Sequence, residues 1–257
     1  MAAAAKGVLL DLGGVVYVGD EPLPGAREAI GRLKAAGLPL RYLTNTTRKP
    51  RRALLESLEK MELPVAEEEL FMPAIAARAL LERNGLSAHL LVHPALEEDF
   101  AGLEGGEGEA LVVGDAAEGF TYQALNTAFR VLEGGAEFYA LARNRSFQDD
   151  DGERSLDTGA FVAALEYASR RQAKVLGKPA RAFFHAAVES LGCAPEDAVM
   201  VGDDAEADVG GAKDAGLKAV LVRTGKYQEG DEARISTPPD HVAADLAAAA
   251  EWILGEE

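Results

Sequence analysis

A single cysteine, Cys193, occurs in this chain of 257 residues, so no disulfide forms within the chain. This favours a reducing compartment, and we expect a cytoplasmic protein. Basic residues are also scarce, because 26 Lys and Arg stand against 43 Asp and Glu and give a net charge of −17. No basic run offsets this charge, which argues against a nucleic-acid partner and against an anionic membrane surface.

Long apolar runs are missing as well. No stretch reaches the roughly 18 to 20 apolar residues that a membrane-spanning helix needs, and residues 1–6 lack the basic region of a signal peptide. Hydrophobic residues still make up 48% of the chain, which is enough to bury a sizeable core. The composition therefore predicts a globular protein without a membrane partner.

Several common catalytic motifs are absent. Gly13-Gly14 is not part of a Gly-x-Gly-x-x-Gly fingerprint, and no Gly-x-x-x-x-Gly-Lys-Ser/Thr loop occurs. The Gly-x-Ser-x-Gly turn of serine hydrolases is missing too. The four histidines are scattered without zinc spacing, which leaves carboxylates as the main candidates for chemistry.

An apolar run at residues 8–10 ends on Asp11, which Gly13 and Gly14 closely follow. This pattern is typical of a buried parallel strand that carries Asp11 to its carboxyl end, where open α/β sheets bind ligands. Asp11 is therefore a candidate nucleophile. Taken alone, an Asp at a strand end is more often a turn former or a helix cap.

Three further segments end probable strands with polar groups. Residues 40–45 end on Thr44 and Asn45, residues 175–179 carry Lys178, and residues 199–204 end on the pair Asp203 and Asp204. In a parallel sheet, four such strand ends converge on one crevice. Thr44 is also a good helix N-cap, which is compatible with holding a phosphate oxygen.

These four segments resemble the signature motifs of the haloacid dehalogenase superfamily. The long interval between the second and third motifs resembles the branch of NagD and the p-nitrophenylphosphatases, which carries a large α/β cap. Residues 44–47, 161–167, 177–179 and 224–227 resemble the group that contains the haloacid dehalogenase-like hydrolase domain-containing proteins and phospholysine phosphohistidine inorganic pyrophosphate phosphatase. The resemblance covers nearly the whole chain.

The hydrophobic pattern predicts an α/β fold with a doubly wound, Rossmann-like parallel-sheet core and an inserted, smaller α/β cap domain. We place the first half of the core at residues 1–80, the cap at 81–176 and the second half of the core at 177–257. A strand at residues 173–176 is expected to return the chain to the core sheet and to place Lys178 at its end.

The resemblance implies a phosphatase in which Asp11 attacks phosphorus and forms an aspartyl phosphate that water hydrolyses. Its partner would be a small phosphorylated molecule, with Lys178 as a second catalytic residue. Magnesium would be held by Asp11, Asp203 and the carbonyl oxygen of Gly13. The phosphate would be bound by Gly13, Gly14, Thr44, Asn45 and Lys178.

Asp204 and Asp208 follow the last of the four strand ends. We place both behind the metal ligands, where they would orient waters or Lys178. Capping of a helix N-terminus is the alternative for both residues, and for Asp208 the two interpretations are equally supported.

Gly13 departs from the family pattern, because most phosphatases of the superfamily carry a second Asp there as the general acid and base. General acid catalysis contributes about 10²–10⁴-fold, so alkyl phosphates should be poor substrates. Aryl phosphates, pyrophosphate, acyl phosphates and phosphoramidates should suffer less. Two alternatives remain open: a catalytically weak phosphate-binding or regulatory protein, and a metal-free haloacid dehalogenase.

The predicted cap contributes two further observations. Residues 112–115 mimic the segment before Asp203, and we interpret Asp115 as a turn residue or a cap-side substrate contact. Residues 143–145 are Arg, Asn and Arg, which makes them candidates for substrate selection. By analogy with family members that carry this cap, the chain could form a homodimer through it.

Overall fold

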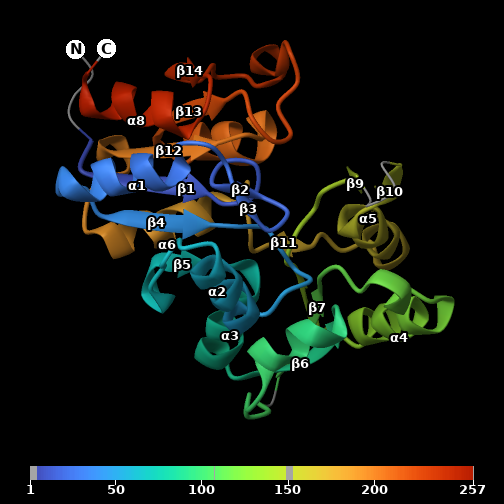
Figure 1. Ribbon diagram of the computed structural model, residues 1–257. Helices are drawn as coiled ribbons and strands as arrows, with labels where there is room; N and C mark the ends of the chain where they lie inside the picture. The colour runs from blue at the N-terminus through green and yellow to red at the C-terminus, as the bar shows by residue number, and fades with distance from the viewer. Residues whose placement is uncertain (1–4, 107, 149–152, 257) are drawn as a thin grey trace. The chain divides into compact units, whose positions relative to one another are not determined.

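The computed structural model describes residues 5–106, 108–148 and 153–256, and the chain forms two compact units (Figure 1). The first unit comprises residues 5–44, 55–71 and 178–256. The second comprises residues 45–54 and the described part of 72–177. Helix α2, Arg51–Lys60, contains the crossing at residues 54 and 55. The first unit is therefore assembled from three separate pieces of chain.

A six-stranded parallel sheet forms the centre of the first unit, in the order β14-β13-β12-β1-β4-β5. β1 is fully buried, as its unbroken apolar run predicts. Its register pairs Leu10 with Val201 of β12 and Asp11 with Leu43 of β4, so these three strands end at the same edge. The strands are β1 Gly7–Asp11, β4 Leu40–Leu43, β5 Leu70–Phe71, β12 Ala198–Gly202, β13 Lys218–Val222 and β14 His241–Ala243.

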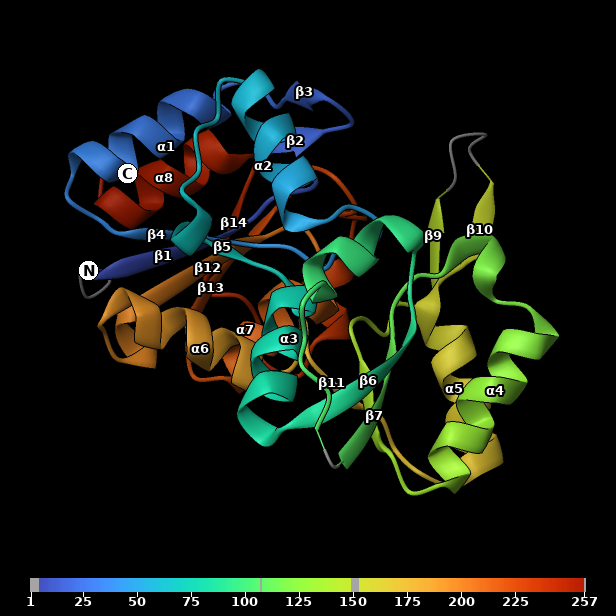
Figure 2. The same ribbon diagram turned by 90° about the horizontal axis from the view of Figure 1, so that it is seen from below.

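Helices cover both faces of this sheet (Figure 2). α1 and α8 pack against each other on one face, and α6 lies on the other. The buried side of α1 is formed by Ala26, Ala29, Ile30 and Leu33, a spacing that gives a helix one apolar stripe. The helices are α1 Ala26–Ala35, α6 Arg181–Leu191, α7 Gly211–Asp214 and α8 Leu246–Leu254, and a short hairpin pairs β2 Tyr17–Val18 with β3 Glu21–Pro22.

The second unit is a smaller α/β structure around a four-stranded parallel sheet, in the order β11-β8-β7-β6. Alternate residues of β7 face opposite sides: Ala110 and Val112 pack with α3, whereas Leu111 and Val113 pack with α4 and α5. The elements are α3 Pro73–Asn84, β6 Leu86–Leu91, β7 Gly108–Val113, α4 Tyr122–Glu133, β8 Glu137–Ala140, β9 Ser146–Gln148, β10 Arg154–Leu156, α5 Thr158–Ser169 and β11 Lys174–Val175. The predicted α/β class, with a parallel-sheet core and a smaller inserted α/β domain, is confirmed.

One predicted strand lies in a different sheet from the one expected. The prediction that residues 173–176 join the core sheet is wrong, because Lys174 and Val175 of β11 pair with Tyr139 and Ala140 of β8 in the second unit. Leu176 packs against the apolar cluster beside α3, so the second unit satisfies the apolar residues of this segment. The Lys178 side chain is therefore delivered to the first unit by the segment before α6 and not by a core strand.

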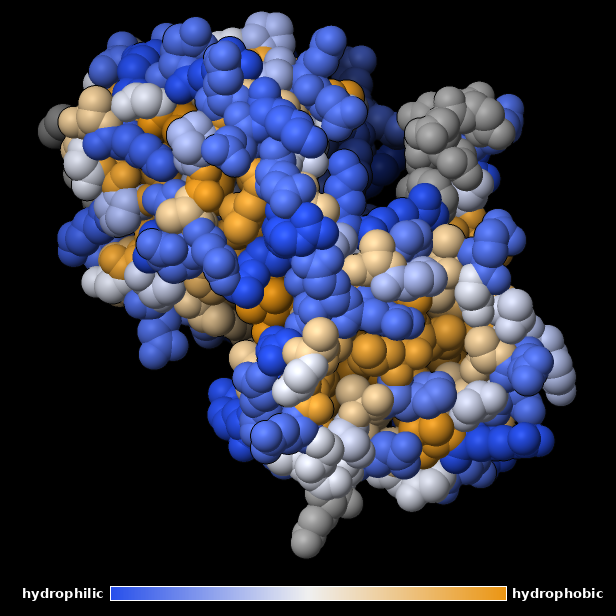
Figure 3. Space-filling model, turned by 60° about the horizontal axis from the view of Figure 1, so that its bottom comes forward, coloured by the Kyte–Doolittle hydropathy of each residue, from blue (hydrophilic) through white to orange (hydrophobic). Residues whose placement is uncertain are grey.

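The described surface agrees with the strongly charged composition. Figure 3 shows hydrophilic residues over much of the face turned to the viewer, with hydrophobic residues gathered in patches between them. Within the described ranges, no helix combines the length and the apolar character that crossing a membrane requires.

Candidate active site

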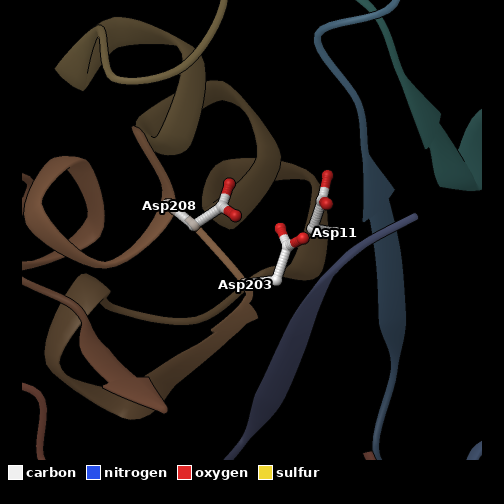
Figure 4. A group of neighbouring side chains, drawn as sticks. All are labelled: Asp11, Asp203 and Asp208. Atoms are coloured by element: carbon white, nitrogen blue, oxygen red, sulfur yellow. The ribbon is translucent and has the colours of Figure 1, made fainter. Parts of the chain in front are cut away.

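Three buried carboxylates meet at the carboxyl end of the core sheet (Figure 4). Asp11 ends β1, Asp203 follows β12, and Asp208 lies in the helical turn Ala205–Gly210. Each offers one oxygen, and these oxygens lie within 4.8 Å of one another. Because buried carboxylates at such distances repel strongly, the group requires a neutralising cation.

Lys178 supplies one positive charge to this group. Its side chain is only 4% exposed, and its Nζ lies 2.5 Å from Oδ1 of Asp11 and 2.6 Å from Oδ1 of Asp208. Burial by itself would lower the pKa of Lys178, but the charges of Asp11 and Asp208 raise it above its ordinary value. Lys178 is thus a fixed cation beside the predicted nucleophile.

Asp208 shares the Lys178 ammonium with Asp11. Burial raises the pKa of Asp208 to about 7, although Lys178 acts in the opposite direction. Its Oδ2 also accepts a hydrogen bond from the backbone N–H of Asp204 at 3.2 Å. A Cβ at Gly202 would overlap the Asp208 carboxylate, which explains the glycine at the end of β12.

Asp203 has one carboxylate oxygen bound and one without a donor. Oδ2 accepts a hydrogen bond from the backbone N–H of Lys226 at 2.7 Å. Oδ1 is buried and accepts no hydrogen bond from any residue that the structure describes. Burial, followed by the charge of Asp11, raises the pKa of Asp203 to about 6. A buried carboxylate oxygen without a donor beside a second carboxylate fits a metal ligand.

Two glycine loops enclose Asp203. Gly14 and Gly225 have φ values of +88° and +60°, and a Cβ on either would overlap Oδ2 of Asp203 and crowd the Cα of the other glycine. The Thr224 hydroxyl donates a hydrogen bond to the Gly14 carbonyl oxygen at 2.5 Å, which ties the two loops together. The sequence motif at residues 224–227 supported the family resemblance, but no role was predicted for it.

Alanine at Gly14 or Gly225 should destabilise the fold by about 2–4 kcal/mol, because it combines a left-handed backbone with steric overlap. Gly13→Ala is the matched control. Apart from its two chain neighbours, no described atom lies within 4 Å of a Cβ at Gly13, and the φ of Gly13 is not positive. Urea unfolding of the three variants measures the difference. Equal stability of Gly14→Ala and Gly13→Ala would contradict the close packing described here.

Thr44, Gly13 and Asn45 are predicted phosphate-binding residues that follow the strands β4 and β1. Thr44 is buried at the end of β4, where its N–H donates to the carbonyl oxygen of Phe71 at 3.1 Å. Gly13 is exposed in the loop after β1. Asn45 belongs to the second unit, so its predicted contact with phosphate stays a prediction. Thr44 and Gly13 therefore follow the adjacent strands β4 and β1, next to Asp11.

Asp204 performs the capping role that was the alternative interpretation. Its Oδ1 accepts hydrogen bonds from the backbone N–H groups of Glu206 and Ala207 at 3.1 and 2.9 Å. Its Oδ2 lies 3.8 Å from Nζ of Lys226. Asp204 thus begins the turn that carries Asp208, and this backbone role follows from its position directly after β12.

In the second unit, Asp115 behaves as a turn residue. Its carboxylate accepts the backbone N–H of Ala117 at 2.9 Å and forms an ion pair with Arg48 at 2.5 Å. Arg143, a candidate for substrate selection, forms an ion pair with the buried Glu166 at 2.5 Å. Both arginines thus have carboxylate partners within this unit, and a substrate contact of Asp115 or of residues 143–145 stays a prediction.

Comparison with known proteins places this site in a family. Residues 8–104 match a family described as haloacid dehalogenase-like hydrolase, and residues 175–249 match one described as HAD-hydrolase-like. Haloacid dehalogenase-like hydrolase domain-containing protein 2 from Homo sapiens is 44% identical over 98% of this chain and 96% of its own. The chain belongs to the haloacid dehalogenase-like hydrolase family.

Further members of this family are similar over their full length. Phospholysine phosphohistidine inorganic pyrophosphate phosphatase from Xenopus laevis is 40% identical, with 100% of this chain and 98% of that protein covered. A solved structure of p-nitrophenyl phosphatase from Archaeoglobus fulgidus superposes with a TM-score of 0.88 at 28% identity, covering 97% of this chain and 100% of that one. The predicted family, its p-nitrophenylphosphatase-like branch and the hydrolase class are confirmed.

Proposed function

We propose that this hydrolase is a magnesium-dependent phosphatase that forms an aspartyl phosphate on Asp11. The observation that carries the proposal is the buried group in which Lys178 bridges Asp11 and Asp208 while Asp203 keeps one oxygen without a donor. The names of the Xenopus laevis and Archaeoglobus fulgidus relatives, both phosphatases, support it.

The donor set fits magnesium. Asp11 and Asp203 offer carboxylate oxygens, and the Gly13 carbonyl would supply a third oxygen without a side chain. A hard, all-oxygen set of this kind suits Mg²⁺ and offers no soft ligand. When bound, magnesium would offset the carboxylate charge and stabilise the negative charge of the phosphoryl group.

Asp11, Lys178 and Thr44 have different roles in phosphoryl transfer. A carboxylate oxygen of Asp11 attacks phosphorus, and the bond from phosphorus to the leaving group breaks with its electron pair on the leaving group. Water next attacks the same phosphorus, and the Asp11 carboxylate and inorganic phosphate are released. Lys178 holds Asp11 in position and opposes the charge that spreads over the phosphoryl oxygens, while Thr44 binds one of those oxygens.

Substrate preference follows from Gly13. No side chain there donates a proton to the leaving group. Leaving groups that depart as stable anions are therefore favoured, as are phosphoramidates whose leaving nitrogen is already protonated. We therefore propose aryl phosphates, pyrophosphate, acyl phosphates and phosphoramidates as the substrate class. The Xenopus laevis relative carries pyrophosphate and two phosphoramidates in its name, which supports this list.

Metal removal tests the proposal. We expect phosphate release from p-nitrophenyl phosphate and pyrophosphate with Mg²⁺, and a loss of at least about 10²-fold when EDTA removes the metal. Added Mg²⁺ should restore activity.

Two other outcomes would replace the proposal. Folded protein that binds a phosphate analogue with Mg²⁺ but never turns over either compound would be a phosphate-binding protein, which the missing acid at Gly13 favours. Halide release from a 2-haloacid without metal would indicate a dehalogenase.

A further inference from the structure

Lys226 is anchored by its backbone beside the carboxylate group. Its N–H donates to Oδ2 of Asp203 at 2.7 Å, and the preceding Gly225 packs against Gly14. The Lys226 backbone therefore cannot leave the site without breaking a hydrogen bond to a predicted metal ligand. Any Lys226 side chain conformation starts from this fixed point.

The side chain of Lys226 is held far more loosely than its backbone. It is 67% exposed, and its Nζ lies 3.8 Å from Oδ2 of Asp204, which is beyond hydrogen-bond distance. Among the described residues, this is the one ion pair that the ammonium forms. A lysine has three donors on a flexible four-carbon stem, so this ammonium is able to turn toward a ligand.

Lys178 differs from Lys226 in its exposure and in how firmly its ammonium is held. Both lysines place positive charge near Asp203, but Lys178 is 4% exposed and is fixed by two short ion pairs. The Lys178 ammonium is therefore held in place by Asp11 and Asp208. A negative group on the substrate, other than the transferring phosphoryl group, requires a second cation.

A second negative group on the substrate is strongly repelled by the carboxylates of this site. The carboxylates of Asp11, Asp203, Asp204 and Asp208 all act electrostatically on Lys226. The chain as a whole carries a net charge of −17. With glycine at position 13, a leaving phosphate also departs without a proton from that position, so it leaves with its full negative charge.

We infer that the Lys226 ammonium binds the anionic leaving group of the substrate, and that it selects substrates with a second phosphate, such as inorganic pyrophosphate. This inference rests on the proposed phosphatase function and specifies its substrate class. Lys226 exchanges its weak contact with Asp204 for charge-assisted hydrogen bonds to the phosphate that departs when Asp11 attacks. The p-nitrophenolate leaving group presents one oxygen with a single delocalised charge, whereas a departing phosphate presents several charged oxygens to the ammonium.

The test compares pyrophosphate with p-nitrophenyl phosphate in Lys226→Met, which keeps the backbone N–H to Asp203 and most of the stem. We expect the ratio of kcat/KM for pyrophosphate to kcat/KM for p-nitrophenyl phosphate to fall by about 10–100-fold, the effect of losing a hydrogen bond to a charged group. Lys226→Arg should recover much of this ratio. Lys6→Met is the matched control, because Lys6 is also 67% exposed and pairs with Asp197 at 2.8 Å away from the site.

A Mg²⁺ titration by calorimetry separates this role from a structural one. If the side chain acts on the leaving group, the affinity for Mg²⁺ in Lys226→Met stays close to that of the wild type. An unchanged substrate ratio, or an equal loss on both substrates, overturns the inference while turnover of p-nitrophenyl phosphate by the wild type still supports the proposed function. Failure of the wild type on both compounds overturns the proposed function and the inference together.

Discussion

Asp11→Asn is expected to lower phosphate release from p-nitrophenyl phosphate by at least about 10⁴-fold, because an amide cannot form the acyl phosphate. The loss should appear in kcat, since Lys178 keeps its ion pair with Asp208 and remains available to bind phosphate. The measurement is steady-state turnover together with the intact mass of acid-quenched protein. A phosphate adduct should appear in the wild type and should be absent from Asp11→Asn.

The control for this experiment is Asp197→Asn, which also removes a carboxylate paired with a lysine but lies outside the site. It should leave turnover within about twofold of the wild type, because surface substitutions have small effects. Circular dichroism of each variant verifies folding, since Asp11 is buried. Turnover of a folded Asp11→Asn variant within tenfold of the wild type would show that water attacks phosphorus directly and that Asp11 is not the nucleophile.

Gly13→Asp is expected to raise the turnover of an alkyl phosphate such as glycerol phosphate by about 10²–10⁴-fold. The added carboxyl group would protonate the alkoxide as it leaves, a step that the wild-type residue cannot perform. The backbone accepts the change, because Gly13 is exposed, its φ is not among the positive values, and no described atom lies within 4 Å of a Cβ there. Turnover of p-nitrophenyl phosphate should rise much less, since p-nitrophenolate departs without a proton.

Gly13→Asn is the matched control, since Asn has nearly the same shape as Asp but no acidic proton that it can transfer to the leaving group. It should leave glycerol phosphate a poor substrate. An equal gain from Asn and Asp would show that the side chain acts by positioning. If Asp gives no gain, proton donation is not what limits alkyl substrates in this chain.

The sequence predicts the positions of Asp11 and Asp203 well, for a physical reason. Asp11 ends one fully buried parallel strand and Asp203 directly follows another, and such strands appear in the sequence as unbroken apolar runs with polar residues at their ends. The register of β1 with β12 then brings the two residues together. The ion pair of Asp208 with Lys178 favours the orienting role over capping, and its place behind the metal ligands stays a prediction.

The prediction for β11 is wrong because a short strand can pair with either of two sheets. β11 consists of Lys174 and Val175, and nothing in so short a segment specifies which sheet it joins. The backbone contact of Lys226 with Asp203 cannot be predicted from side-chain chemistry, because it is made by the backbone N–H group. Gly225 gave a usable signal, since a glycine shortly after a buried strand often marks close approach of two backbones.

The pairing of β1 with β12 has a consequence for how this protein is made. The strands of the second sheet lie within residues 86–175, so that sheet can form while the rest of the chain is still on the ribosome. β1 pairs with β4 early, but its other edge meets β12 only after Ala198–Gly202 has emerged. Pairing over so long a sequence separation is slow, and an unpaired apolar strand edge invites association with other chains. The strand that carries Asp11 is thus synthesised before the second sheet but receives its second neighbour only after that sheet, so one of its edges stays open in the meantime.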